Sequence, residues 1–261
     1  MAVARLKSTL SGTAGALLDV FSAEKLPRSD VSDYHDVEQR VQSVLPPGAP
    51  PVVMRLVSNC HSAVSIPAPF QHTFCAAPGN NPRKRMLYTS KALSLFQLID
   101  GAWVMSFMVY AHEYGHDAPA CNRGRVYVSY LDSVPFLQPY SSRSAAYQMK
   151  LVAYFDWVRR RGFGTVHLCS APSGDDGRYV FWCHPEHHRT RNEDGLRAWY
   201  CEVAKQCQSH GIIAASSGLY ECGHREEQPA LASDDSSRGT TSDERPVLPP
   251  IFKGDFWIAD L

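Results

Sequence analysis

The sequence lacks both a long apolar run and an excess of charge of either sign. No stretch of roughly 18 consecutive apolar residues occurs, so we expect no transmembrane helix and no membrane partner. Lysine and arginine together number 26, and aspartate and glutamate together also number 26. The chain therefore has no global field that would recruit nucleic acid, and any charge used in recognition must be local.

The sequence also lacks paired-cysteine motifs and a typical secretory signal. Its eight cysteines are widely scattered and form no CxxC motif. In a chain of 261 residues this pattern favours reduced, mostly buried thiols in an intracellular protein over a disulfide framework. The apolar stretch within residues 1–21 is interrupted by Ser, Gly and Thr and meets Asp19, which is not typical of a signal peptide.

Strands alternate with helices along the chain, and this order predicts an α/β fold. One domain, residues 1–261, is expected, with a mobile loop at 222–246, where Ser, Asp, Glu, Gly and Pro predominate. The apolar residues of 251–261 are expected to pack back on the body of this domain. The predicted strands are 52–57, 103–111, 126–131, 165–169, 179–183 and 212–214, the predicted helices are 5–24, 89–98, 141–161 and 195–210, and a loop is predicted at 66–87.

The segment that follows the strand at 126–131 has the features of an anion site. A helix begins there after a serine, and Arg143 lies in its first turn. A helix N-terminus presents free N–H groups and partial positive charge, and a guanidinium adds a planar fork that can hold a phosphate through two hydrogen bonds. Ser142 and Ser144 add hydroxyl donors. The alternative interpretation is an ordinary serine-capped helix start with Arg143 in solvent.

Eight short segments resemble, in order, the catalytic domain of the CREB-binding-protein class of lysine (histone) acetyltransferases. The resemblance covers roughly residues 5–261. Each segment is short, but the combination and the order are specific. The segments are YTSKALSLFQLIDG (88–101), EYG (113–115), RVYVSYLDSV (125–134), SRSAAY (142–147), YFDWVRRRGF (154–163), FWCHPE (181–186), LRAWY (196–200) and KGDFW (253–257).

The resemblance implies a central mixed β-sheet wrapped by helices and long loops, with acetyl-CoA as co-substrate and no metal. The loop between Cys169 and Tyr200 would fold over acetyl-CoA. Arg143 and Ser144 would hold the phosphates, and Tyr147 would flank the cofactor. By the same resemblance, the other cofactor-binding residues are Leu131, Asp132 and Ser133 along the pantetheine channel, together with Cys169 and Pro172.

The resemblance also implies a mechanism and a substrate class. Tyr200 would be the general acid that protonates the departing CoA thiolate, and Trp199 would wall the site. No dedicated base is implied, because transfer is fast once the lysine amine is positioned. The implied partners are lysine-rich proteins such as histones, with no direct nucleic-acid contact, and the implied location is the nucleus, with the cytoplasm as the alternative. Asp175 and Asp176 would add acidity to the substrate groove or lie in a solvated turn.

Three departures from the family pattern keep a second interpretation open, a catalytically weak or inactive CoA-binding module of the same fold. Cys169 stands where the family usually has tryptophan, and Gly195 stands where it has lysine or arginine. The basic loop that follows the GDFW segment in the family has no counterpart before Leu261, so we expect a divergent, C-terminally short member. The smaller side chain of Cys169 would also widen the acyl tunnel for groups longer than acetyl.

A competing motif is HEYGH (112–116), which matches the HExxH signature of zinc peptidases. In that chemistry two histidines on one helical face bind zinc and the glutamate activates water. Gly115 and Pro119 disfavour a helix here, and the preceding apolar run is typical of a strand. A zinc peptidase therefore stays a distant alternative. A second set of possible ligands, Cys183, His184, His187 and His188, is expected to be structural or loop residues.

Overall fold

The computed structural model describes residues 31–68, 71, 84–169, 180–181, 193–216 and 250–253. Its centre is a five-stranded sheet in the order β1-β2-β3-β4-β5, in which the first four strands pair antiparallel and β4 and β5 pair parallel. The predicted α/β fold with a central mixed sheet is confirmed. The strands are β1 (Val52–Ser65), β2 (Arg85–Ile99), β3 (Ala102–Tyr114), β4 (Arg125–Ser133) and β5 (Thr165–Leu168).

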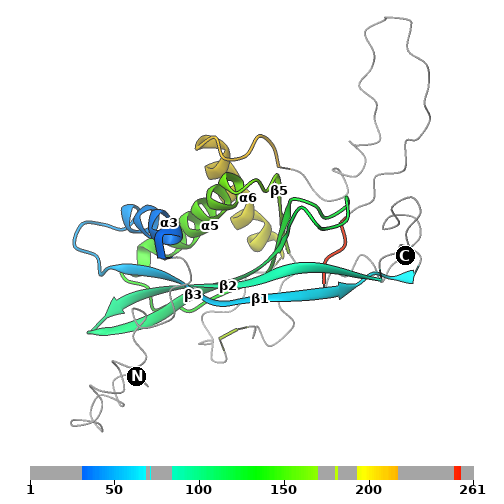
Figure 1. Cartoon of the computed structure of the whole chain (residues 1–261). Helices are drawn as coiled ribbons and strands as arrows, with labels where there is room; N and C mark the ends of the chain where they lie inside the picture. The colour runs from blue at the N-terminus through cyan, green and yellow to red at the C-terminus, as the bar shows by residue number, and fades with distance from the viewer. Residues whose placement is uncertain are drawn as a thin grey trace, which may run out of the picture.

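Three helices cover one face of this sheet (Figure 1). They are α3 (Val31–Ser43), α5 (Arg143–Arg160) and α6 (Glu193–Ser209), and a short 3-10 turn, η1 (Tyr140–Ser142), precedes α5. Helix α5 is the crossover between the parallel strands β4 and β5, and it is the central helix, because most of its residues are buried. The described helices include none long and apolar enough to cross a lipid bilayer.

The core alternates between the two faces of the sheet, as the two-residue period of a strand requires. Val126 and Val128 of β4 belong to the main core beneath the helices, whereas Tyr127 between them belongs to a second cluster on the opposite face. Helices α3 and α6 contribute apolar residues to the main core at helical spacing. These residues are Tyr34, Val37 and Val41 from α3 and Tyr200, Val203 and Cys207 from α6.

The segment 250–253 closes the second cluster. Asn122 is fully buried, and its side chain both donates to the carbonyl of Ile251 (2.8 Å) and accepts from its N–H (2.9 Å). Phe252 stacks face to face on Tyr127, with ring centroids 4.3 Å apart. The expectation that the apolar C-terminal residues pack back on the domain is therefore confirmed for Ile251 and Phe252, while the rest of 251–261 lies outside the described residues.

The prediction of a helix at 89–98 was wrong, because this segment is the centre of β2. β2 lies between β1 and β3 and is covered on both faces, so its sequence shows no alternation of apolar and polar residues. A strand signal was present at its end. Asp100 and Gly101 both have positive φ (50° and 78°), which gives a two-residue hairpin turn of the Asp-Gly type.

The strands predicted at 52–57, 103–111, 126–131 and 165–169 are confirmed, with β1 continuing to Ser65. The helices predicted at 141–161 and 195–210 are also confirmed. The strand predicted at 212–214 was wrong: Ile212 donates its N–H to the carbonyl of Cys207 (2.8 Å) and so closes the turn after α6 instead of pairing with a strand. The helix at 5–24, the mobile loop at 222–246 and most of the loop at 66–87 lie outside the described residues. The loop prediction was wrong at its end, because residues 85–87 begin β2, and residues 180–181, the described part of the strand predicted at 179–183, are not in a strand.

Candidate active site

Side chains from α6 connect two separate parts of the predicted site. Trp199 donates its indole N–H to the hydroxyl oxygen of Ser144 in the first turn of α5 (3.1 Å). The next residue, Tyr200, donates its hydroxyl to the backbone carbonyl of Cys169, directly after β5 (3.2 Å). The two aromatic rings meet edge to face, with centroids 5.5 Å apart. The structure therefore brings together four of the residues that the sequence singled out.

Tyr200 is held by packing as well as by its hydrogen bond. It is 8% exposed and belongs to the main core, so its ring position is fixed by its neighbours. The acceptor is also fixed, because Cys169 donates its own N–H to the carbonyl of Val128 (3.0 Å) and so continues the pairing of β5 with β4. A tyrosine hydroxyl in this arrangement has a defined direction before any substrate arrives.

The N-terminus of α5 carries an unused donor. The guanidinium of Arg143 lies over the ring of Tyr140, 4.6 Å from its centroid, and one of its nitrogens, Nη1, is buried with no hydrogen-bond partner among the described residues. The predicted serine cap is wrong in one respect: Ser142 occupies the N-cap position, but its side chain makes no capping hydrogen bond. Because buried polar atoms are normally paired, this set of donors fits a bound phosphate.

Asp132 is engaged by backbone N–H groups. Its Oδ1 accepts from the N–H of Ser133 (2.8 Å), and its Oδ2 accepts from Val180 and Phe181 (2.9 Å each). The carboxylate thereby ties the end of β4 to a segment 48 residues further along the chain. Leu131 beside it packs against the main core. Pro172, Asp175 and Asp176 lie outside the described residues.

Tyr147 uses its hydroxyl within the fold. The hydroxyl lies 3.0 Å from two acceptors, the carbonyls of Ser106 and Val134, and the ring stacks on Phe107 with centroids 4.5 Å apart. Burial raises the pKa of Tyr147 well above its ordinary value, so the hydroxyl stays protonated and acts as a donor. Both the hydroxyl and the ring of Tyr147 are thus used within the main core.

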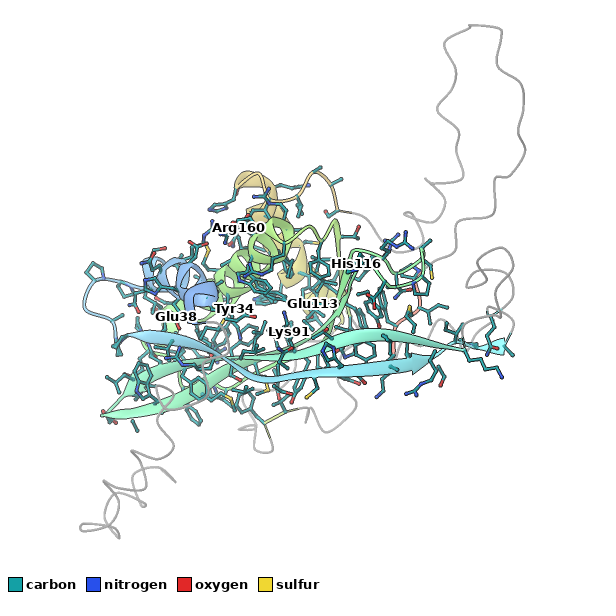
Figure 2. The ribbon with its side chains drawn as sticks, in the orientation of Figure 1. Tyr34, Glu38, Lys91, Glu113, His116 and Arg160 are labelled. Carbon is teal, nitrogen blue, oxygen red and sulfur yellow. The ribbon has the colours of Figure 1, made fainter. Side chains whose placement is uncertain are left out.

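The buried Lys150 and the partners of Glu113 were missed by the sequence analysis. Lys150 of α5 is fully buried and donates to two backbone carbonyls of the sheet. Glu113 pairs with Lys91 (2.7 Å) and accepts the hydroxyl of Tyr154 (3.0 Å) between the sheet and α5 (Figure 2). The only available signal for Lys150 was its place in the apolar run AAYQMKLVAYF, where a lysine interrupts residues that a central helix would bury.

The HEYGH motif does not have peptidase geometry. Its first three residues belong to β3, so His112 lies in the second cluster on one face while Glu113 faces α5 and is paired with Lys91. His116 is exposed beyond the strand. Within the described part of the chain no group of three potential metal ligands occurs. The alternative set at 183–188 lies outside that part.

The buried His112 and the half-buried His167, both next to the second cluster, predict a pH dependence of stability. Burial and then the charge of Lys253 lower the pKa of His112 to about 4, and burial and then Arg125 lower the pKa of His167 to about 4. An unfolded histidine has a pKa of about 6.5, so the unfolded chain binds more protons between these values. Stability is therefore fully present above about pH 6.5 and is lost as the pH falls towards 4.

The magnitude can be measured by urea unfolding at pH 7 and pH 5. His112 alone should account for about 2 kcal/mol of lost unfolding free energy between these two values. His112→Leu should remove that share of the loss, whereas His61→Leu, at an exposed position of β1, should leave it unchanged. Identical pH dependence in the wild type and His112→Leu would contradict the assignment.

The model of one known protein-domain family matches most of this chain. The model of the histone acetyltransferase domain KAT3 matches residues 42–260. The chain belongs to this family. The KAT3 match extends from the end of α3 to the C-terminal segment, and the resemblance to CREB-binding-protein acetyltransferases is thereby confirmed.

Individual relatives of this KAT3 domain come from animals and plants. Protein cbp-1 of Caenorhabditis elegans is 28% identical over 91% of this chain and 11% of its own length. Histone acetyltransferases HAC12 and HAC1 of Arabidopsis thaliana are each 29% identical over 91% of this chain, and over 14% and 15% of their own lengths. The chain thus spans only about a seventh of the plant relatives that it matches. An acetyltransferase domain implies acetyl-CoA as co-substrate.

Proposed function

We propose that this KAT3 domain transfers the acetyl group of acetyl-CoA to lysine side chains of proteins, histones among them. The observation that carries the proposal is the family match over residues 42–260, which includes the buried Tyr200 at the junction of α6 with the end of β5. The family contributes the reaction, and the geometry contributes a proton donor and an anion-binding helix end.

In the proposed reaction, bound acetyl-CoA supplies a thioester whose carbonyl carbon is attacked by a neutral lysine amine. A new C–N bond forms as the C–S bond breaks, the attacking nitrogen releases one proton to solvent, and the departing thiolate needs a proton from a donor that solvent then reprotonates. Tyr200 would donate it, since its hydroxyl is oriented by the carbonyl of Cys169 and needs only to exchange one acceptor for another. Trp199 would hold α6 against α5 through Ser144, so that the donor and the phosphate site keep their relative positions.

The phosphate groups would lie at the N-terminus of α5. Arg143 offers a buried nitrogen with no hydrogen-bond partner in the part of the chain that the structure describes, and Ser144 offers an exposed hydroxyl. No side chain caps the first turn, although the N–H of Arg143 itself donates to the carbonyl of Tyr140. Each of these donors fits a phosphate oxygen. No dedicated base is required, because holding the amine next to the thioester supplies most of the rate enhancement.

The second candidate is an acetyl-CoA-binding module that turns over slowly or not at all. The observation that favours it is the pair of departures at Cys169 and Gly195, since both positions adjoin the contacts that define the site. Transfer of labelled acetyl from acetyl-CoA to mixed core histones decides between the two. Acetylated histones support the enzyme, whereas CoA binding without transfer supports the module.

The small side chain of Cys169 predicts relaxed selectivity for the acyl group. The side chain of Cys169 packs against the second cluster and forms no large aromatic wall beside Tyr200, so propionyl-CoA should be used within about tenfold of acetyl-CoA, the range that one methylene spans in an apolar pocket. Cys169→Trp should reduce use of propionyl- and butyryl-CoA more than use of acetyl-CoA. Comparing kcat/KM for the three thioesters tests this, and strict acetyl selectivity in the wild type would count against it.

We further propose that the domain acts in the nucleus on lysine-rich protein partners. This follows from the chromatin proteins that its relatives are named for and from the balance of 26 basic and 26 acidic residues, which gives the domain no net attraction to DNA. Contact with chromatin would then come from the substrate protein itself.

A further inference from the structure

A lysine lies fully buried in the middle of the central helix. Lys150 is 1% exposed, and its Nζ donates to the carbonyl of Leu93 in β2 (2.7 Å) and to that of Phe107 in β3 (3.3 Å). Burial lowers the pKa of Lys150 well below its ordinary value. Methionine has nearly the same length and would fill this space without the cost of removing an amine from water. Packing alone does not account for a lysine here.

One acceptor of Lys150, the carbonyl of Phe107, lies beside an irregularity of the sheet, and the other, that of Leu93, lies two residues before it on β2. Leu95 pairs with Phe107 while Phe96 pairs with Met105, so Ser106 is an extra residue of β3. A β-bulge of this kind disrupts the ladder and leaves backbone groups for other partners. One of these groups, the carbonyl of Leu95, is satisfied locally, because it accepts the hydroxyl of Ser106 (3.3 Å).

The remaining acceptors of the bulge are used by α5 and by the end of β4. The carbonyl of Ser106 accepts the hydroxyl of Tyr147 (3.0 Å) and the N–H of Val134, directly after β4 (3.0 Å). The carbonyl of Phe107, one residue on, accepts Lys150. Tyr147 and Lys150 are three residues apart and so lie on the same face of α5. One bulge therefore anchors both the exit of β4 and the central helix.

We propose that Lys150 is a positioning residue for acetyl-CoA, which together with Tyr147 latches α5 onto the Ser106 bulge and so sets where Arg143 and Ser144 present their donors. The helix transmits the position, because Lys150 lies about two turns from Arg143 along a rigid rod. The end of β4, which carries Asp132, is tied to the same carbonyl. The two sides of the cofactor site thus share one point of attachment. This inference rests on the proposed function.

The test uses Lys150→Met in the full chain, with three measurements. CoA affinity by calorimetry should weaken about five- to twentyfold, since donors displaced by a fraction of an ångström lose much of their hydrogen-bond strength. The melting temperature should change little or rise, because a buried amine is replaced by an apolar side chain. The kcat/KM for acetyl-pantetheine, which lacks the phosphates, should stay within about twofold of the wild type, because the phosphate contacts are the ones displaced.

A matched control separates positioning from general loosening of the core. Val152→Ala, in the same helix and fully buried, should lower the melting temperature while leaving CoA affinity unchanged. Arg143→Ala shows how much CoA affinity is lost with the phosphate contact itself. When Lys150→Met is added to Arg143→Ala, it should weaken CoA binding far less than it does in the wild type. If Lys150→Met does not fold, Tyr147→Phe carries the same three measurements, because it keeps the ring and removes the hydroxyl that contacts the bulge at Ser106 and the carbonyl of Val134 directly after β4.

These results separate a failure of the proposed role of Lys150 from a failure of the proposed function. If the wild type binds CoA and Arg143→Ala weakens that binding, the phosphate site stands. Wild-type CoA affinity in Lys150→Met would then overturn the inference. An equal loss of acetyl-pantetheine turnover in Lys150→Met, or an equal loss of CoA affinity in Val152→Ala, would also overturn it. A wild-type protein that does not bind CoA would overturn the proposed function and the inference together.

Discussion

Tyr200→Phe should lower kcat for acetyl transfer by about 100- to 10,000-fold, the usual contribution of a positioned general acid. The phenyl ring keeps the buried packing of Tyr200, and only the hydroxyl is lost. CoA affinity should therefore survive, and stability should fall by about 1 kcal/mol through the lost bond to the carbonyl of Cys169. The measurements are initial rates of labelled acetyl transfer to core histones and CoA binding by calorimetry.

Tyr114→Phe is the matched control for this substitution. Tyr114 is as deeply buried but lies in the second cluster, on the opposite face of the sheet from the helices. The same chemical change there should leave kcat within about threefold of the wild type, because no reacting group is removed. Unchanged transfer in Tyr200→Phe would refute the proposed acid, and equal losses in both variants would assign the effect to structure.

Arg143→Ala should weaken CoA binding by about 10- to 100-fold, since a hydrogen bond from a charged donor contributes about 1.5–3 kcal/mol. Among the described residues the buried Nη1 has no hydrogen-bond partner, so the substitution removes only the contact of the guanidinium with the ring of Tyr140 and the fold should be preserved. At saturating acetyl-CoA the kcat should be nearly unchanged. Calorimetric titration with CoA, together with KM and kcat for transfer, separates the two effects.

Arg159→Ala serves as the control at the other end of the same helix. Arg159 is half-exposed and pairs with Asp156 (2.7 Å), far from the N-terminal donors. Its loss should leave CoA affinity unchanged and cost at most about 1 kcal/mol of stability, as for other surface ion pairs. Equal CoA affinity in Arg143→Ala and the wild type would place the phosphates elsewhere on the protein.

The sequence predicted the elements whose signals are local. The buried strand at 126–131 and the long helix that ends before Gly162 both appear as expected, since each has its own apolar pattern and terminating residue. The strand β2 was missed because burial on both faces removes the alternation by which a strand is recognised. The turn at 211–214 was missed because its hydrogen bonds, not its composition, prevent pairing.

In the site, too, the sequence predicted which residues take part but not the contacts between residues far apart in the chain. Motif order identified the family and placed Arg143, Trp199 and Tyr200 on their helices. The acceptor of Tyr200 is a backbone carbonyl 31 residues away, which no side-chain pattern encodes. The engagement of Asp132 with residues 180–181 and that of Lys150 with a β-bulge are equally invisible in sequence, because they depend on the register of strands that pair across the sheet.

The depth of Tyr200 has a consequence for how such domains diverge. The ring lies in the core and the hydroxyl reaches the carbonyl of Cys169, so in the proposed mechanism turnover and folding would depend on different atoms of one residue. Tyrosine and phenylalanine codons differ by one nucleotide. If Tyr200 is the acid, a single nucleotide change would leave a folded domain that still binds acetyl-CoA but no longer transfers its acetyl group.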